Sequence, residues 1–199
     1  MKTCAHLAAA LLVVATPTAA ADLRQEVKQG PVLRAIRTAE PEFKKSAELI
    51  QGADFILVGE VLNQRPRLSS DASQVLTEYT IEVTRVLVGD SSRVAPGQRL
   101  VARVPGGHLQ VDGVAVELEA LDFPTIPWLV PHVFFLERDA GDAYRIRGGS
   151  QGVWELQPNG QVRSHHPDVK HHQVPLHFNQ RPLEFMLDEI NHTLKRGKR

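Results

Sequence analysis

Cysteine is almost missing from this chain of 199 residues: Cys4 is its one thiol. Cys4 precedes the apolar segment 7–15, whereas a lipid-modified cysteine follows such a segment, so lipidation is not expected. Cleavage of residues 1–21 as a signal peptide would leave a mature chain without any thiol. Disulfides, cysteine-ligated zinc and cysteine nucleophiles are therefore excluded from its chemistry.

The chain also lacks an excess of charge of either sign, with 23 basic and 23 acidic residues, and only 6% of its residues are aromatic. Binding of single-stranded nucleic acid needs a basic groove with aromatic side chains for stacking. We therefore expect no nucleic-acid partner. After residue 21 no stretch is apolar enough to cross a bilayer, so we expect no transmembrane segment in the mature chain.

The first residues contain the parts of an export signal in the usual order. Lys2 gives a positive start, residues 7–15 form a short apolar core, Pro17 breaks a helix, and alanines at 19–21 suit cleavage. This order is typical of a secretory signal peptide over residues 1–21. The alternative is a frayed helix of a cytosolic protein. We expect the mature protein to be secreted, either into the periplasm or outside the cell.

Residues 53–163 predict a series of short strands separated by turns. The segments 55–62 and 133–136 are nearly continuous in apolar residues, which is typical of strands buried on both faces. Residues 77–88 alternate at first, and a change of phase predicts a β-bulge near Arg85. Asp-Gly at 112–113 predicts a type I′ turn in a hairpin over residues 109–118.

The regions on either side of these strands differ in character. Residues 22–52 have apolar side chains at helical spacing and predict an N-terminal helical segment. Residues 164–180 are polar and rich in histidine, and predict a loop. Residues 181–199 predict a C-terminal helix with a basic tail, because Pro182 suits its first turn and apolar residues follow on one face.

These elements together predict a mainly β protein with flanking helices, in which residues 53–163 form a small OB-like antiparallel β-barrel. Closure into a barrel is favoured because it leaves no exposed strand edge in a chain without disulfides. A β-sandwich is the main alternative.

Five motifs follow one another in this region. They are a helix end that enters an Ala-Asp-apolar strand at 47–61, a strand and turn at 79–90, Pro-Gly-Gly at 105–107, Val-Phe-Phe-Leu at 133–136 and Gly-Ser-Gln-Gly at 149–152. Their order resembles a group of uncharacterised secreted bacterial proteins. Over residues 47–156 it is also similar to the netrin-like, OB-type barrel of the tissue inhibitors of metalloproteinases. The resemblance implies a barrel. Those inhibitors bind the protease metal through an N-terminal cysteine, which the mature chain lacks, so no functional residue is carried over.

Two segments are candidates for binding a partner. Residues 122–131 form a loop stiffened by prolines with two aromatic side chains, Phe123 and Trp128, which suits a rigid contact patch. The turn at 105–108 adds His108. The alternative is a loop that folds over one end of the barrel and buries Trp128 in the core.

Histidines are concentrated between residues 165 and 177. Neutral imidazoles bind zinc or copper, so His165, His166, His171 and His172 are candidate metal ligands. Their spacing matches no rigid metal motif, and a solvated loop is the alternative. We therefore expect no cofactor other than zinc or copper at this segment.

Ser150 lies in the sequence Gly-Gly-Ser-Gln-Gly at 148–152, which matches the GxSxG motif of α/β-hydrolases. In those enzymes the serine lies on a turn between a strand and a helix. Here residues 153–156 predict a strand after the motif, which favours a glycine-rich bend between strands.

The sequence as a whole favours an exported, non-enzymatic binding module whose partner is an unidentified protein or envelope component. A metal-binding protein that uses the histidine segment 165–177 is the alternative. A serine hydrolase at Ser150 is less favoured than either.

Overall fold

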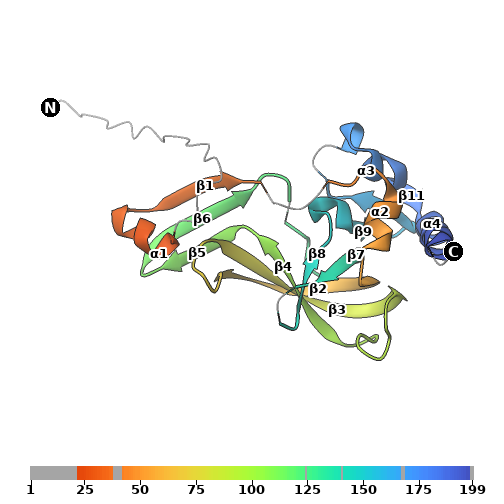
Figure 1. The fold of residues 1–199 in the computed structure, drawn as a ribbon, viewed down its shortest axis with the longest axis horizontal. Coiled ribbons are helices and arrows are strands. Elements are labelled where there is room, and N and C mark those ends of the chain that lie inside the picture. The colour runs from red at the N-terminus through yellow and green to blue at the C-terminus, as the bar shows by residue number, and fades with distance from the viewer. Residues whose placement is uncertain (1–21, 38–41, 124, 140, 167–168, 198–199) are drawn as a thin grey trace.

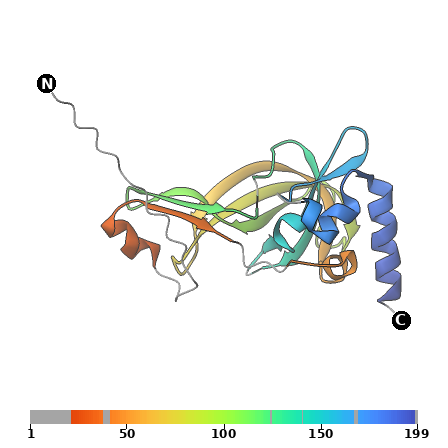
Figure 2. The same ribbon diagram turned by 90° about the horizontal axis from the view of Figure 1, so that it is seen from above.

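The computed structural model describes residues 22–37, 42–123, 125–139, 141–166 and 169–197. The predicted signal peptide lies outside these residues. Within them, strands predominate and form a sheet of eight strands and a sheet of three, arranged along an elongated molecule (Figures 1 and 2). The prediction of a mainly β protein with flanking helices is confirmed.

Five strands of the larger sheet form a closed ring of backbone pairings. β2 (Phe55–Leu68) pairs with β3 (Val75–Val88), β3 with β4 (Arg99–Pro105), and β4 with β8 (Ala143–Ile146). β7 (Pro131–Arg138) pairs with both β8 and β2 and so completes the ring. The β4–β8 pairing is parallel and the other four are antiparallel, which corrects the prediction of a wholly antiparallel barrel. The chain leaves the ring after β4 and returns through β7, so β8 reaches β4 running in the same direction.

Alternate side chains of the ring strands pack into one hydrophobic cluster. Its fully buried members include Leu57, Ile81, Ala102 and Phe134, one from each of β2, β3, β4 and β7. This alternation follows from the period of two along a strand, which places every second side chain on the same face.

The predicted β-bulge is present in β3. Val58 pairs with Arg85 and Gly59 pairs with Val83, so Thr84 has no partner residue in β2. The Thr84 hydroxyl instead donates a hydrogen bond to the carbonyl of Val58, at 3.1 Å. The bulge near Arg85 is thereby confirmed, and such an extra residue bends a long strand.

The smaller sheet lies at one end of the molecule, in the order β1–β6–β5 (Figure 1). β5 (Gly107–Val111) and β6 (Val114–Ala120) form the expected hairpin. Asp112 and Gly113 have φ angles of 50° and 81° in its turn, as a type I′ turn requires. The hairpin prediction is confirmed.

The N-terminal segment is helical only in part. Its elements are α1 (Leu23–Glu26), a 3-10 turn η1 (Val27–Gln29), the strand β1 (Val32–Ile36) and α2 (Ser46–Gln51). The helical prediction is wrong for β1, which pairs in parallel with β6. Local spacing of apolar residues does not reveal a strand whose hydrogen-bonding partner lies far along the chain.

Helices α2, α3 (Gln173–Phe178) and α4 (Leu183–Arg196) lie at the other end of the molecule (Figure 1). They cover the face of the larger sheet that is opposite the ring interior, where Trp154 and Phe135 are buried. α4 confirms the predicted C-terminal helix. None of the helices that the structure describes is both long and apolar enough to span a bilayer.

The remaining strands extend the larger sheet beyond β7. β9 (Val153–Leu156), β10 (Gln161–Ser164) and the short β11 (Arg181–Pro182) follow it in that order. The segment 164–180, predicted to be a loop, contains α3 and a 3-10 turn, η3 (Val169–His171). Burial of Val174 and Phe178 stabilises α3. The Phe178 ring packs edge-on against the Trp154 ring, with 5.6 Å between the ring centroids.

Candidate functional site

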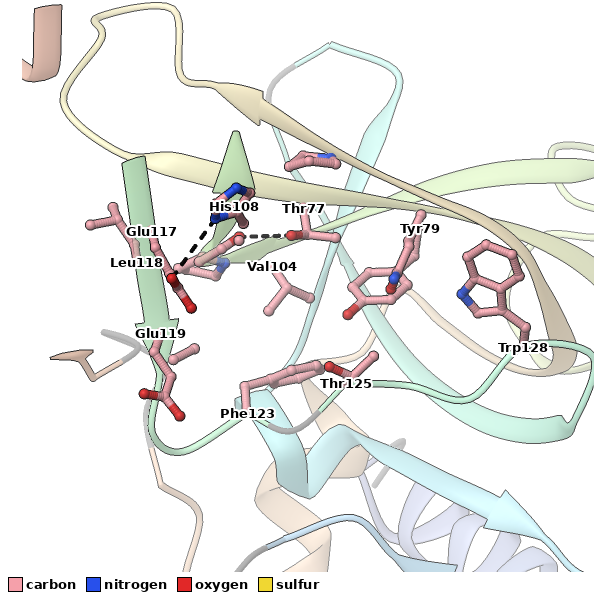
Figure 3. Close-up of a pocket in the computed structure, with 16 residues that line it drawn as sticks. Thr77, Tyr79, Val104, His108, Glu117, Leu118, Glu119, Phe123, Thr125 and Trp128 are labelled. Atoms are coloured by element: carbon pink, nitrogen blue, oxygen red, sulfur yellow. Dashed lines mark hydrogen bonds and ion pairs between the residues drawn. The ribbon is translucent and has the colours of Figure 1, made fainter. Parts of the chain in front are cut away.

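A cleft of about 630 Å³ lies where the smaller sheet meets the ring (Figure 3). Strands β2, β3, β4, β5 and β6 and the loop after β6 all contribute to it. The lining residues are Gln64, Pro66, Thr77, Tyr79, residues 104–108, residues 117–120, Phe123, Thr125 and Trp128.

Two glycines carry the chain from one sheet to the other at the cleft. Gly106 and Gly107 have φ angles of 101° and 139°, in a region that favours glycine. A Cβ at Gly107 would lie 2.6 Å from the Thr77 hydroxyl oxygen. That hydroxyl donates a hydrogen bond to the Gly106 carbonyl at 2.7 Å. The Pro-Gly-Gly turn is thus fixed against β3, and it places β5 along one side of the cleft.

The loop at residues 121–130 is anchored through Ile126, which is fully buried. The Tyr79 hydroxyl forms a hydrogen bond with the backbone of Ile126, and burial raises the pKa of that hydroxyl. The amide of Leu129 donates to the carbonyl of Val61 at 3.1 Å. These contacts fix the second half of the loop, residues 126–129, against the ring.

Trp128 is 53% exposed, whereas Ile126, two residues earlier in the loop, is fully buried. The possibility that Trp128 is buried in the core is therefore wrong. Phe123 is 6% exposed and packs within the ring cluster. Figure 3 shows Trp128 at one end of the cleft and the Phe123 ring along its floor.

The charged side chains of the cleft are acidic. Glu117 and Glu119 project from β6 at the end opposite Trp128 (Figure 3). The His108 ring nitrogen Nδ1 lies 3.8 Å from a Glu117 carboxylate oxygen. Among the described lining residues there is no lysine or arginine, so the cleft favours a ligand with positive charge.

The three predicted binding residues all line this cleft, although nothing in their sequence spacing places them together. Phe123 and Trp128 come from the loop after β6, and His108 comes from β5. Sequence reasoning missed Tyr79 and the two glutamates. Their periodic positions on strands resemble those of any core or surface residue, so no local signal marks them.

The predicted metal ligands are not brought to one place. The rings of His166 and His172 lie 4.1 Å apart, and Nδ1 of His172 contacts a carboxylate oxygen of Glu42 at 2.5 Å. His171 lies in the turn η3. His165 instead faces His132, whose Nε2 lies 3.1 Å from the Nε2 of His165.

Glu155 completes a group of three with His132 and His165. One of its carboxylate oxygens lies 4.0 Å from the His165 Nε2, and the ligand atoms of the three residues are all within 4.8 Å of one another. His132 is fully buried, and the side chains of Glu155 and His165 are only 12% and 11% exposed. Burial, with the neighbouring His165, lowers the pKa of His132 to about 4, and burial also lowers the pKa of His165.

Ser150 lies in a 3-10 turn, η2 (Gly149–Gly152), which joins β8 to β9. It is 4% exposed and is followed by a strand. This arrangement differs from the exposed strand-to-helix turn that presents a nucleophilic serine.

No protein-family model matches the chain, and a search of curated proteins finds no significant match.

Proposed function

We propose that this protein is an exported, non-enzymatic binding module that holds a positively charged segment of a partner protein in the cleft. The observation that carries the proposal is the convergence of two segments, 105–108 and 122–131, on one cleft with a half-exposed tryptophan. Tryptophan is enriched among the few residues that contribute most of the binding energy at protein interfaces.

The chemistry of the lining indicates what the partner segment contains. Trp128 offers an apolar face for an aliphatic or aromatic group and can also stack against a cation. Glu117 and Glu119 supply negative charge at the opposite end. A segment with an apolar residue a few positions from a lysine or arginine satisfies both ends at once.

The pairing order of the ring supports an OB-like barrel similar to the netrin-like domains. The ring strands, numbered one to five in chain order, are β2, β3, β4, β7 and β8. Neighbours around the ring follow the order β2–β3–β4–β8–β7, which is 1-2-3-5-4. OB-type barrels bind ligands on the face of their second and third strands. Here those strands are β3 and β4, and both line the cleft. The acidic lining favours a protein ligand over an oligonucleotide.

A comparative pull-down from an envelope extract of the source cells tests the proposal. The immobilised wild-type protein should retain a partner protein that Trp128→Ala retains at least about tenfold less well, as expected for a central interface residue. The matched control is Leu33→Ala. Leu33 is 68% exposed but lies on β1, outside the cleft.

The outcome has three readings. Loss of the partner from Trp128→Ala alone supports the proposal. Equal retention by wild type and both variants contradicts it. If wild type retains a polysaccharide or a lipid in place of a protein, the ligand of the cleft is an envelope component and not a partner protein.

A further inference from the structure

Three neighbouring strands bring the group of His132, Glu155 and His165 together. His132 on β7 is directly opposite Glu155 on β9 in the antiparallel register. Directly opposed residues project from the same face of a sheet, so these two side chains meet. β10 pairs with the other edge of β9, and His165 follows its last residue, Ser164.

The separations within the group suit ligands of a single ion. Zinc bonds to imidazole nitrogen and carboxylate oxygen at about 2.0–2.2 Å, so tetrahedral ligand atoms lie roughly 3.3–3.5 Å apart. The two Nε2 atoms are already 3.1 Å apart. The Glu155 oxygen, at 4.0 Å from the His165 Nε2, needs only a small side-chain rotation to reach the same ion.

The proton of His132 is fixed on the nitrogen that points away from the group. Nδ1 of His132 lies 2.6 Å from the backbone carbonyl of Val130, which can only accept a hydrogen bond. In the neutral ring Nδ1 therefore carries the proton and Nε2 carries a lone pair aimed at His165. Metal-binding histidines are commonly oriented in this way, with the second ring nitrogen donating to a carbonyl.

We propose that His132, Glu155 and His165 form a binding site for one divalent transition-metal ion, with zinc as the ion that best fits two imidazoles and a carboxylate. This site is independent of the cleft function proposed above. Three protein ligands leave a fourth coordination position for water or another ligand. The histidine segment predicted from the sequence contributes His165 alone, and the other two ligands come from the sheet.

Arg163 pairs with Glu155 in this structure, and its side chain is 53% exposed. A bound cation replaces the positive charge that Arg163 supplies to the carboxylate. The half-exposed guanidinium can then turn to solvent while the cation holds the carboxylate.

Zinc titration of the chelator-treated full chain by calorimetry tests the site. Wild type should bind one equivalent, and His165→Gln and Glu155→Gln should each weaken binding about 100-fold, because loss of even a residue that only hydrogen-bonds to a metal ligand costs roughly 10–100-fold. The matched control is the double variant His166→Ala/His172→Ala, which removes the other close histidine pair and should change the affinity less than about twofold. Circular dichroism of each metal-free variant establishes that it is folded.

X-ray absorption at the zinc edge supplies a readout that needs no variant. The wild-type complex should show two imidazole nitrogens and oxygen ligands at about 2.0–2.2 Å. The proposal is overturned if wild type and His165→Gln bind equally, if the His166/His172 variant loses the ion, or if no saturable binding occurs. In the last case the Nε2–Nε2 contact is a hydrogen bond between two histidines and nothing more.

Discussion

At the scale of single residues, the cleft depends on which side chain of the loop after β6 turns inward. Ile126 is fully buried in the ring cluster, and its backbone forms a hydrogen bond with the Tyr79 hydroxyl. Trp128, two residues later, is half exposed. The tryptophan is therefore available for contact while the loop is held against the ring.

His132 should make the stability of the metal-free protein depend on pH. Its pKa is lowered from 6.5 to about 4 in the folded state, so between these values the unfolded chain binds a proton that the folded protein does not. Stability should therefore fall as the pH falls from 6.5 towards 4, by about 3 kcal/mol in total, and this effect should level off below that range. Urea unfolding with a chelator at about pH 7.5 and about pH 5 measures it.

The variant His132→Gln is the control for this pH effect, because glutamine does not titrate. Its loss of stability between the two pH values should be smaller than that of wild type by about 2 kcal/mol. Equal losses in the two proteins would show that other groups cause the pH dependence.

Single residues also show where the sequence is informative and where it is not. Phe123, Trp128 and His108 could be named because aromatic, proline and glycine residues are conspicuous in loops. His132 could not, because it stands beside the apolar run 133–136 and far from the other histidines. The signal that it offered was a lone polar residue in a strand buried on both faces, which requires a hydrogen-bonding partner.

At the scale of elements, the turn between β4 and β5 fixes the shape of the cleft. Gly107→Ala should destabilise the protein by about 2–3 kcal/mol, since it combines an unfavourable φ of 139° with a contact of 2.6 Å to the Thr77 hydroxyl oxygen. Gly97→Ala is the matched control, because Gly97 also has positive φ but open space around it. We expect it to cost about 1 kcal/mol. Equal unfolding free energies for both variants would contradict a steric role for Gly107.

Hairpins were predictable from the sequence because their signals are local. The Asp112-Gly113 turn and the bulge near Arg85 both follow from the pattern within a few residues. β1 was not predictable, because its hydrogen bonds go to β6. The helix α3 was hidden for a similar reason, since its burial depends on contact with Trp154.

At the scale of the whole molecule, the larger sheet separates two hydrophobic clusters. The ring interior lies on one face, and helices α2 and α4 cover the other (Figure 2). The two helices also contact each other, and the Ser46 hydroxyl of α2 donates to the Glu189 carboxylate of α4 at 3.0 Å. The C-terminal helix is thus part of the folded core rather than an appendage.

Removal of a buried side chain from α4 should therefore destabilise the entire fold. Met186 is fully buried in the hydrophobic cluster between the helices and the larger sheet, so Met186→Ala should lower the unfolding free energy by about 2–5 kcal/mol. Asp188→Ala, on the exposed face of the same helix, should change it by less than about 0.5 kcal/mol. Denaturant unfolding monitored by tryptophan fluorescence gives both values, and a small effect of Met186→Ala would mean that α4 is not required for stability.

The cleft joins the two sheets and is the proposed binding site, so the most direct measurement is site-specific photo-crosslinking in an envelope extract. A photoreactive residue is placed in turn at His108, at Trp128 and at the control position Leu33 on β1. We expect positions 108 and 128 to crosslink to the same partner protein and position 33 not to crosslink to it. Crosslinks of equal yield at position 33, or different partners at positions 108 and 128, would contradict the proposed binding site.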